Sequence, residues 1–356
     1  MTPPQLLYAG SYAAADQPGI YAFTFDAATG RLAGQGSWAG IAHPSFLAIH
    51  PHRPWLFAVS ETSTAEDGVA GAVWALRRRP GPAILEPINH QASGGDSPCH
   101  LAVDATGRWL LVANYGTGSV GLLPIAADGA LGPAADLVQH HGRGPHPVRQ
   151  AGPHAHSATF APDGRFVLVA DLGLDAVLVY ALDPVAGRLQ PQTQVPTRPG
   201  AGPRHLAFHP GGRHVYVANE LDNTLAVYAY DAARGALQEQ QVVATLPPAA
   251  TASTVADIHL SAAGNRVYVS NRGHDSIAVF DVAANGQLER GSFLPCGGRW
   301  PRNFAIAPGG QFLLVANQHS DALAVLPLGD SGSTLGAPRA RAVIPGVACV
   351  QFAGAA

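Results

Sequence analysis

The feature that most constrains this sequence is a short apolar segment that recurs seven times. The copies occupy residues 6–12, 55–61, 109–115, 166–172, 214–220, 266–272 and 312–318, so their starts are 49, 54, 57, 48, 52 and 46 residues apart. Each copy is rich in valine, leucine and aromatic residues and has a small polar residue near its end. This composition is typical of strands that are buried on both faces.

Most copies have the same neighbours, which together define a repeating unit. A turn with glycine precedes the repeated strand at residues 162–165, 210–213 and 308–311, and another apolar run, such as residues 205–209, comes before it. A third run follows at residues 177–182, 225–230 and 277–282, and then a weaker fourth one, such as residues 241–246. Four antiparallel strands in about 50 residues are typical of a propeller blade. We therefore expect an all-β, seven-bladed β-propeller with four antiparallel strands per blade.

The two ends of the sequence predict how the ring closes. The first copy, at residues 6–12, is a second strand with no first strand before it. Residues 346–352 resemble the first strands at residues 45–50 and 302–307. We expect this last strand to complete the first blade, which removes exposed sheet edges and makes residues 1–356 a single domain.

Composition and charge exclude several classes of function. Hydrophobic residues make up 47% of the chain and charged residues 13%, which is enough for a large core, and a net charge of −3 gives no support for nucleic-acid binding. No apolar run approaches the ~20 residues of a membrane span, and residues 1–5 lack the basic and apolar regions of a signal peptide. Cys99, Cys296 and Cys349 fit neither a disulfide framework nor a zinc motif. We expect a cytoplasmic protein, a monomer or weak homo-oligomer, with no nucleic-acid or membrane partner.

The strand ends predict where a functional site lies. In an antiparallel blade, the start of the first strand and the end of the second lie on the same face. The second strands end at Tyr12, Glu61, Tyr115, Leu172, Glu220, Arg272 and Gln318. The first strands start near His43, His100, His154, His156, Arg204, His205, Asp257, His259, Arg302 and Asn303. We expect these side chains to converge on one mouth of the central channel, and such convergence of charge indicates a functional site.

The residue types in this ring limit its chemistry. The sequence has no Gly-x-Ser-x-Gly elbow and no P-loop. His154 and His156 could hold a metal ion, but no firm third ligand is evident, so we expect neither a metal nor a cofactor. What remains is carboxylate and imidazole as acid and base, with guanidinium groups for an anion and a developing oxyanion. Hydrolysis of an ester or lactone needs these parts.

Six motifs, in this order, resemble those of the lactonase family of seven-bladed propellers: residues 153–157 (PHAHS), 202–205 (GPRH), 219–220 (NE), 257–259 (DIH), 271–272 (NR) and 301–304 (PRNF). The family includes bacterial 6-phosphogluconolactonases and fungal carboxy-muconate lactonising enzymes, and the resemblance covers essentially the whole chain. It implies metal-independent hydrolysis of an anionic sugar lactone such as 6-phosphogluconolactone. It also implies that His156, Arg204, Glu220 and Arg272 form the catalytic group.

The resemblance and the strand ends together suggest roles for these residues. We expect Glu220, with His156 nearby, to activate water or to pass a proton to the leaving ring oxygen. Arg204 and Arg272 would hold the substrate anion and the developing oxyanion. We expect the remaining substrate-binding side chains to be His154, His205, Asp257, His259, Arg302, Asn303, Tyr115 and Gln318.

The same residues also fit other functions and other roles. A lactonising cycloisomerase that acts on a carboxylated diene would use the same residues. A non-catalytic propeller scaffold of the WD type would show Gly-His and Trp-Asp pairs, and a haem propeller would show Cys-x-x-Cys-His; the sequence has neither pattern. His205 and His259 could instead bond neighbouring blades, Glu220 and Arg272 could form a structural ion pair, and we expect Asp171 and Asp175 to be turn formers.

Overall fold

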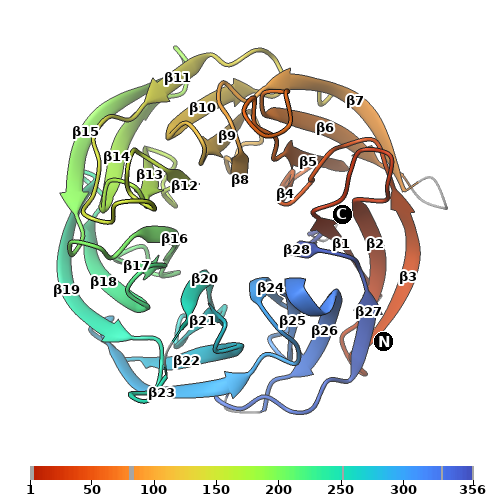
Figure 1. Ribbon diagram of the computed structural model, residues 1–356, viewed down its shortest axis with the longest axis vertical. Coiled ribbons are helices and arrows are strands. Elements are labelled where there is room, and N and C mark those ends of the chain that lie inside the picture. The colour runs from red at the N-terminus through yellow and green to blue at the C-terminus, as the bar shows by residue number, and fades with distance from the viewer. Residues whose placement is uncertain (1–3, 80–83, 251, 330–331, 355–356) are drawn as a thin grey trace.

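The computed structural model describes residues 4–79, 84–250, 252–329 and 332–354. Within these ranges, seven four-stranded antiparallel sheets stand in a ring around a central channel (Figure 1). The only helical element there is the 3-10 turn η1 (Gln318–Ser320). The predicted all-β, seven-bladed propeller with four strands per blade is confirmed.

The strands of each blade run from the channel outwards in chain order, except in the first blade. That blade consists of β28 (Val347–Phe352), β1 (Gln5–Ser11), β2 (Ile20–Asp26) and β3 (Arg31–Trp38). The second consists of β4 (Leu47–Ile49), β5 (Trp55–Ser60), β6 (Ala72–Arg78) and β7 (Leu85–Ala92), and the third of β8 (Pro98–Val103), β9 (Trp109–Asn114), β10 (Ser119–Pro124) and β11 (Asp136–Gln139).

The remaining four blades follow the same pattern. The fourth consists of β12 (Ala155–Phe160), β13 (Phe166–Asp171), β14 (Ala176–Asp183) and β15 (Arg188–Pro196), and the fifth of β16 (Pro203–Phe208), β17 (His214–Asn219), β18 (Thr224–Asp231) and β19 (Ala236–Ala244). The sixth consists of β20 (Thr254–Leu260), β21 (Arg266–Arg272), β22 (Ser276–Val282) and β23 (Leu288–Pro295), and the seventh of β24 (Pro301–Ile306), β25 (Phe312–Asn317), β26 (Ala322–Pro327) and β27 (Ala340–Val343).

The repeated apolar segments of the sequence are the second strands, and they are the most buried elements. Every residue of β5, β13 and β25 is buried. Each such strand packs against the neighbouring blades on both faces; for example, Leu168 of β13 and Val217 of β17 belong to one apolar cluster. Burial on both faces explains why these strands appear in the sequence as continuous apolar runs.

The ring closes as the sequence predicts, because β28 pairs with β1 and places the C-terminal strand innermost in the first blade (Figure 1). Gly10 of β1 lies in this closure. A Cβ atom at Gly10 would come within 2.2 Å of the carbonyl oxygen of Pro44, so no larger residue fits there. The closure leaves the first blade without an unpaired inner edge on β1.

The inner strands share an irregularity near their starts. In β8, β12, β16, β24 and β28, one residue of the first strand has no partner in the second strand. In β20, two consecutive residues lie opposite a single residue of β21. A β-bulge bends the strand locally and redirects the side chain of the extra residue. The residues skipped in the first five are Cys99, His156, Arg204, Arg302 and Ala348, and the pair in β20 is Ala256 and Asp257. Equivalent bulges in six blades therefore aim a ring of side chains that includes four of the predicted site residues, His156, Arg204, Asp257 and Arg302.

Candidate active site

Glu220, directly after β17, is the centre of a buried charged cluster. Its Oε1 accepts a hydrogen bond of 2.6 Å from Nη2 of Arg149. Its Oε2 lies 3.0 Å from Nε of Arg204 and 2.9 Å from Nη2 of Arg272. The side chains of Glu220, Arg204 and Arg272 are only 4%, 3% and 7% exposed, so solvent screens these ion pairs weakly.

The backbone of β20 fixes two of these guanidinium groups. Arg204 donates through Nη1 to the carbonyl oxygen of Ala256, and Arg272 donates through Nη2 to that of Val255 at 2.9 Å. The Nε atoms of both arginines are buried without an aligned acceptor among the described residues, although that of Arg204 lies close to the carboxylate. Both guanidinium groups are thus held in place by a backbone carbonyl oxygen and by the carboxylate of Glu220.

Burial and charge set the ionisation of this cluster. Burial alone would raise the pKa of Glu220, but Arg272, Arg204 and Arg149 lower it to about 2. Burial lowers the pKa of Arg204 to about 9, and the like charges of Arg272 and Arg302 act in the same direction. At neutral pH the carboxylate is therefore ionised and the guanidinium groups are charged.

A second charged cluster, from the seventh, first and second blades, lies at the same ends of the strands. Nη2 of Arg302 donates to the hydroxyl oxygen of Tyr12 at 2.5 Å, and its guanidinium lies 5.1 Å from the centre of the Tyr12 ring. The Tyr12 hydroxyl lies 2.9 Å from each carboxylate oxygen of Glu61, which also accepts a hydrogen bond from Ser45. Arg302 is therefore held by Tyr12, which is in turn held by Glu61.

The two clusters together form what we call the arginine mouth, which consists of Arg149, Arg204, Arg272, Arg302, Glu61 and Glu220. Four guanidinium groups face two carboxylates, so positive charge is in excess. Guanidinium groups bind carboxylates and phosphates by paired, charge-assisted hydrogen bonds. The arrangement is therefore suited to an anionic ligand.

Aromatic and imidazole rings line the mouth on the side of the third and fourth blades. His154 stacks on Tyr115 at a centroid distance of 4.4 Å and donates from Nδ1 to its carbonyl oxygen, and the Tyr115 hydroxyl accepts from Arg149. His156, the bulge residue of β12, lies edge-on to Tyr115 and to His205, each at 5.4 Å. Burial, followed by Arg204 and His205, holds the pKa of His156 well below its usual range, so this imidazole is neutral.

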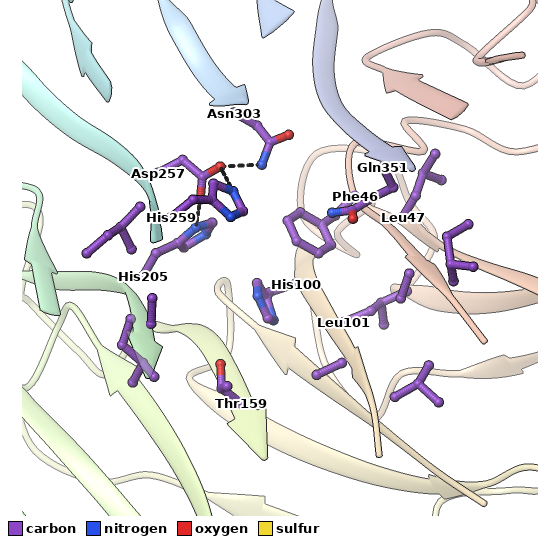
Figure 2. Close-up of a pocket in the computed structure, with 17 residues that line it drawn as sticks. Phe46, Leu47, His100, Leu101, Thr159, His205, Asp257, His259, Asn303 and Gln351 are labelled. Atoms are coloured by element: carbon purple, nitrogen blue, oxygen red, sulfur yellow. Dashed lines mark hydrogen bonds and ion pairs between the residues drawn. The ribbon is translucent and has the colours of Figure 1, made fainter. Parts of the chain in front are cut away.

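Other predicted site residues lie deeper in the channel, so the prediction of a single mouth is wrong for them. His205, Asp257, His259 and Asn303 line a second cavity of about 340 Å³, the far cavity (Figure 2). Its other walls include later parts of the inner strands, such as Leu47–Ile49 of β4 and residues 101–103 of β8. The physical reason is that each residue advances an inner strand by about 3.3 Å along the channel. The residue that follows a bulge therefore faces a lower level than the bulge residue.

Gln318, also predicted to bind substrate, takes a different position. It begins the turn η1, and its backbone N–H donates to the carbonyl oxygen of Trp300. Its buried Oε1 has no partner among the described residues. No hydrogen bond or ion pair among the described residues joins Gln318 to the arginine mouth.

Arg149 belongs to the arginine mouth, but its position in the sequence did not predict this. It lies in residues 140–154, which connect β11 to β12. The adjacent Gln150 is fully buried and donates to the carbonyl oxygen of Leu172 and to Oδ1 of Asp175, which ties this connection to the fourth blade. The available signal was length, because the spacing of 57 residues across this connection is the largest of the six.

Several contacts that the structural interpretations of single residues predict are present. His205 of β16 bonds Asp257 of β20 at 2.8 Å, which joins neighbouring blades. Asp171 accepts hydrogen bonds from His140 and from the backbone N–H groups of His154 and Leu174, as expected of a turn-forming aspartate. Glu220 and Arg272 do form an ion pair between blades, but they share it with two further arginines.

No group of three or more His, Cys, Asp or Glu side chains in the described part of the chain is arranged to hold a metal ion. No helix within the described ranges is long and apolar enough to cross a membrane.

Comparison with known proteins agrees with this architecture. The family model described as "Lactonase, 7-bladed beta-propeller" matches residues 6–352, so the chain belongs to this family. It is 34% identical to the 6-phosphogluconolactonase of Bacillus subtilis over 97% of both chains, and 32% identical to that of Formosa agariphila over 86% of this chain and 87% of the other. It also resembles the structure of the periplasmic gluconolactonase of Pseudomonas aeruginosa, with a TM-score of 0.92 and 35% identity over 98% of this chain and 99% of the other.

Proposed function

We propose that this protein hydrolyses an anionic sugar lactone, and that 6-phospho-D-glucono-1,5-lactone is the substrate and 6-phosphogluconate the product. The observation that carries the proposal is the arginine mouth, in which four guanidinium groups, two of them almost fully buried, face two carboxylates. Membership of the lactonase family and the names of the two bacterial 6-phosphogluconolactonases support it. The proposal includes no metal or other cofactor.

In this proposal His156, Arg204, Glu220 and Arg272 form the catalytic group. Arg204 and Arg272 bind the lactone carbonyl oxygen as it becomes an oxyanion, since both are fixed by backbone carbonyl groups before substrate arrives. Glu220 is the counter-ion that sets their positions. His156 contacts the reacting lactone as a neutral imidazole.

The substrate phosphate is assigned to the more accessible arginines. The side chain of Arg149 is 36% exposed and that of Arg302 is 18% exposed, against 3% for Arg204. Tyr115 and His154 form an aromatic wall beside Arg149 that can pack against the sugar. A phosphate bound there would place the lactone ring over the more buried guanidinium groups.

A cytoplasmic location belongs to the same proposal. Cys99, Cys296 and Cys349 are free and buried, which is compatible with a reducing compartment. The P. aeruginosa relative is described as periplasmic and as a gluconolactonase, so a comparison of phosphorylated and unphosphorylated lactones is the informative assay.

The test is hydrolysis of freshly generated 6-phosphoglucono-δ-lactone and of gluconolactone, with the uncatalysed rate subtracted and with and without a chelator. We expect the phosphorylated lactone to have the higher kcat/KM and the chelator to have no effect. Glu220→Gln should lower kcat/KM by about 10²-fold and Arg204→Ala by about 10³-fold, because each disturbs oxyanion stabilisation. Near-normal hydrolysis by both variants would contradict the assigned roles, and no turnover of either lactone would overturn the proposed function.

A further inference from the structure

A very small cavity lies in the channel between the arginine mouth and the far cavity. Its volume is about 10 Å³, which is close to the space that a single water molecule needs. Polar groups from both levels line it, namely Ser45, Cys99, Arg204, His205, Arg302 and Asn303. Phe46, His205 and Asn303 line both this small cavity and the far cavity, so they form the partition between them.

His205 is held rigidly in this partition. Its Nδ1 lies 2.8 Å from Oδ1 of Asp257 and donates to it. The other carboxylate oxygen of Asp257 accepts hydrogen bonds from Nε2 of His259 at 2.9 Å and from Nδ2 of Asn303 at 2.6 Å (Figure 2). It also accepts one from the backbone N–H of Phe304 at 3.2 Å. A carboxylate that is bonded on both oxygens fixes the orientation and the tautomer of the imidazole.

The other ring nitrogen of His205 is then available as a proton acceptor. Because Nδ1 carries the proton, Nε2 presents a lone pair. This Nε2 is buried and has no hydrogen-bond partner among the described residues. A water molecule in the small cavity would lie beside this imidazole and beside the guanidinium groups of Arg204 and Arg302.

His205 is better suited to accept a proton than the two candidates from the sequence. Each oxygen of Glu220 is paired with at least one guanidinium group, so its proton affinity is low. His156 has no carboxylate partner within the described ranges of the chain, and its charged neighbours Arg204 and Arg302 would oppose a positive imidazolium. Asp257, by contrast, stabilises the imidazolium that forms when His205 takes a proton.

We propose that His205 is the general base that activates the hydrolytic water and that Asp257 positions it; this inference rests on the proposed lactone hydrolysis. Nε2 of His205 takes a proton from water while the water oxygen bonds to the lactone carbonyl carbon. Arg204, together with Arg272, stabilises the resulting oxyanion. The tetrahedral intermediate then collapses, the bond between the carbonyl carbon and the ring oxygen breaks, and the imidazolium returns its proton to that oxygen.

The charges around His205 predict how its protonation changes during turnover. Burial and then Arg204 lower the pKa of His205 to about 4, while Asp257 opposes them. A substrate anion bound to Arg204 would offset part of that positive charge and raise the pKa of His205. The other rings and charges that face His205 are His100, His156, His259 and Phe46. We therefore expect kcat/KM, which reports the free enzyme, to fall only below about pH 4 and kcat to fall at a higher pH.

The experiment compares His205→Asn and Asp257→Asn with the matched control His50→Asn, a buried histidine that lines neither the small cavity nor the far cavity and bonds the carbonyl oxygen of Gly107. We expect His205→Asn to lower kcat by about 10²- to 10⁴-fold with KM changed by less than about threefold, and to remove the acidic limb of the profile. Asp257→Asn should lower kcat and shift that limb. The control should keep kcat within about threefold.

A second measurement needs no variant at the site. Histidine labelled with ¹³C in the wild-type protein allows the His205 imidazole to be titrated by NMR. Its peak is assigned from its proximity to both Phe46 and His156. The pKa of His205 should rise when 6-phosphogluconate is added.

The outcomes separate the two proposals. If the wild-type protein does not hydrolyse lactones, the proposed function fails and the role of His205 fails with it. If the wild-type protein is active but folded His205→Asn keeps its kcat and pH profile, only the assignment of His205 is overturned. If His205→Asn does not fold, a His205 pKa that 6-phosphogluconate leaves unchanged overturns the assignment instead.

Discussion

At the scale of single residues, the arginines of the mouth differ in how far they are withdrawn from solvent. Arg204 and Arg272 are almost fully buried and bonded to backbone carbonyl groups, whereas the side chain of Arg149 is 36% exposed. A buried, fixed charge can stabilise charge that develops during the reaction. A more accessible one binds the ground state and the transition state about equally.

Arg149→Ala should therefore weaken binding more than chemistry. We expect KM for the phosphorylated lactone to rise by about 10- to 100-fold, because a charge-assisted hydrogen bond contributes about 1.5–3 kcal/mol, while kcat changes by less than about threefold. Steady-state kinetics with both lactones measure this, and the unphosphorylated lactone should be affected less. Arg143→Ala, an exposed arginine of the same connection, is the control. A fall in kcat at constant KM would show that Arg149 takes part in the chemical step.

At the scale of elements, the connection at residues 140–154 and the bulges of the inner strands shape the site. The bulges aim His156, Arg204 and Arg302 into the channel from three blades. The connection brings Arg149 to Glu220 from outside the repeat. Its position depends on Gln150, whose amide is fully buried and hydrogen-bonded to the fourth blade.

Gln150→Leu should release this connection from the blade. The substitution leaves the buried carbonyl oxygen of Leu172 without its donor, at a cost of about 1–3 kcal/mol. We expect faster limited proteolysis within residues 140–154 and a higher KM for the phosphorylated lactone, with kcat largely retained. Gln190→Leu, at an exposed position of β15, should change neither property. Unchanged proteolysis in Gln150→Leu would show that other contacts hold the connection.

At the scale of the whole molecule, the ring depends on the strand that closes it. Val350 of β28 is 1% exposed and packs in the apolar cluster between the seventh and first blades. Its backbone N–H donates to Oδ1 of Asn303, the residue that also bonds Asp257. The strand that closes the ring, β28, is therefore hydrogen-bonded to Asn303 in the partition of the channel. We propose that the ring unfolds as one cooperative domain.

Val350→Asp should destabilise the entire ring. A buried, unpaired carboxylate in this cluster should cost more than about 3 kcal/mol, so we expect a lower urea midpoint, followed by circular dichroism and by tryptophan fluorescence. Both probes should report one coincident transition in the wild-type protein. Val343→Asp, at a valine that is 82% exposed on β27, should leave the midpoint almost unchanged. Two separate wild-type transitions would contradict the single cooperative domain.

The sequence by itself determined the architecture, because burial on both faces leaves a direct record in the residues. The apolar runs coincide with the second strands, and residues 346–352 were recognisable as an inner strand. The strand ends also identified Glu220, Arg204 and Arg272, which the structure brings together. An antiparallel blade places those ends on one face whatever the details of packing.

Only the tertiary structure decided the levels within the channel. A bulge in β16 makes the side chains of Arg204 and His205 point to different levels of the channel. No residue pattern in the sequence predicts this bulge, because it depends on how two strands pair. Arg149 reaches Glu220 through a connection without periodicity. The pairing of His205 with Asp257 joins residues 52 positions apart, and the division of the channel into an arginine mouth and a far cavity follows from such contacts between blades.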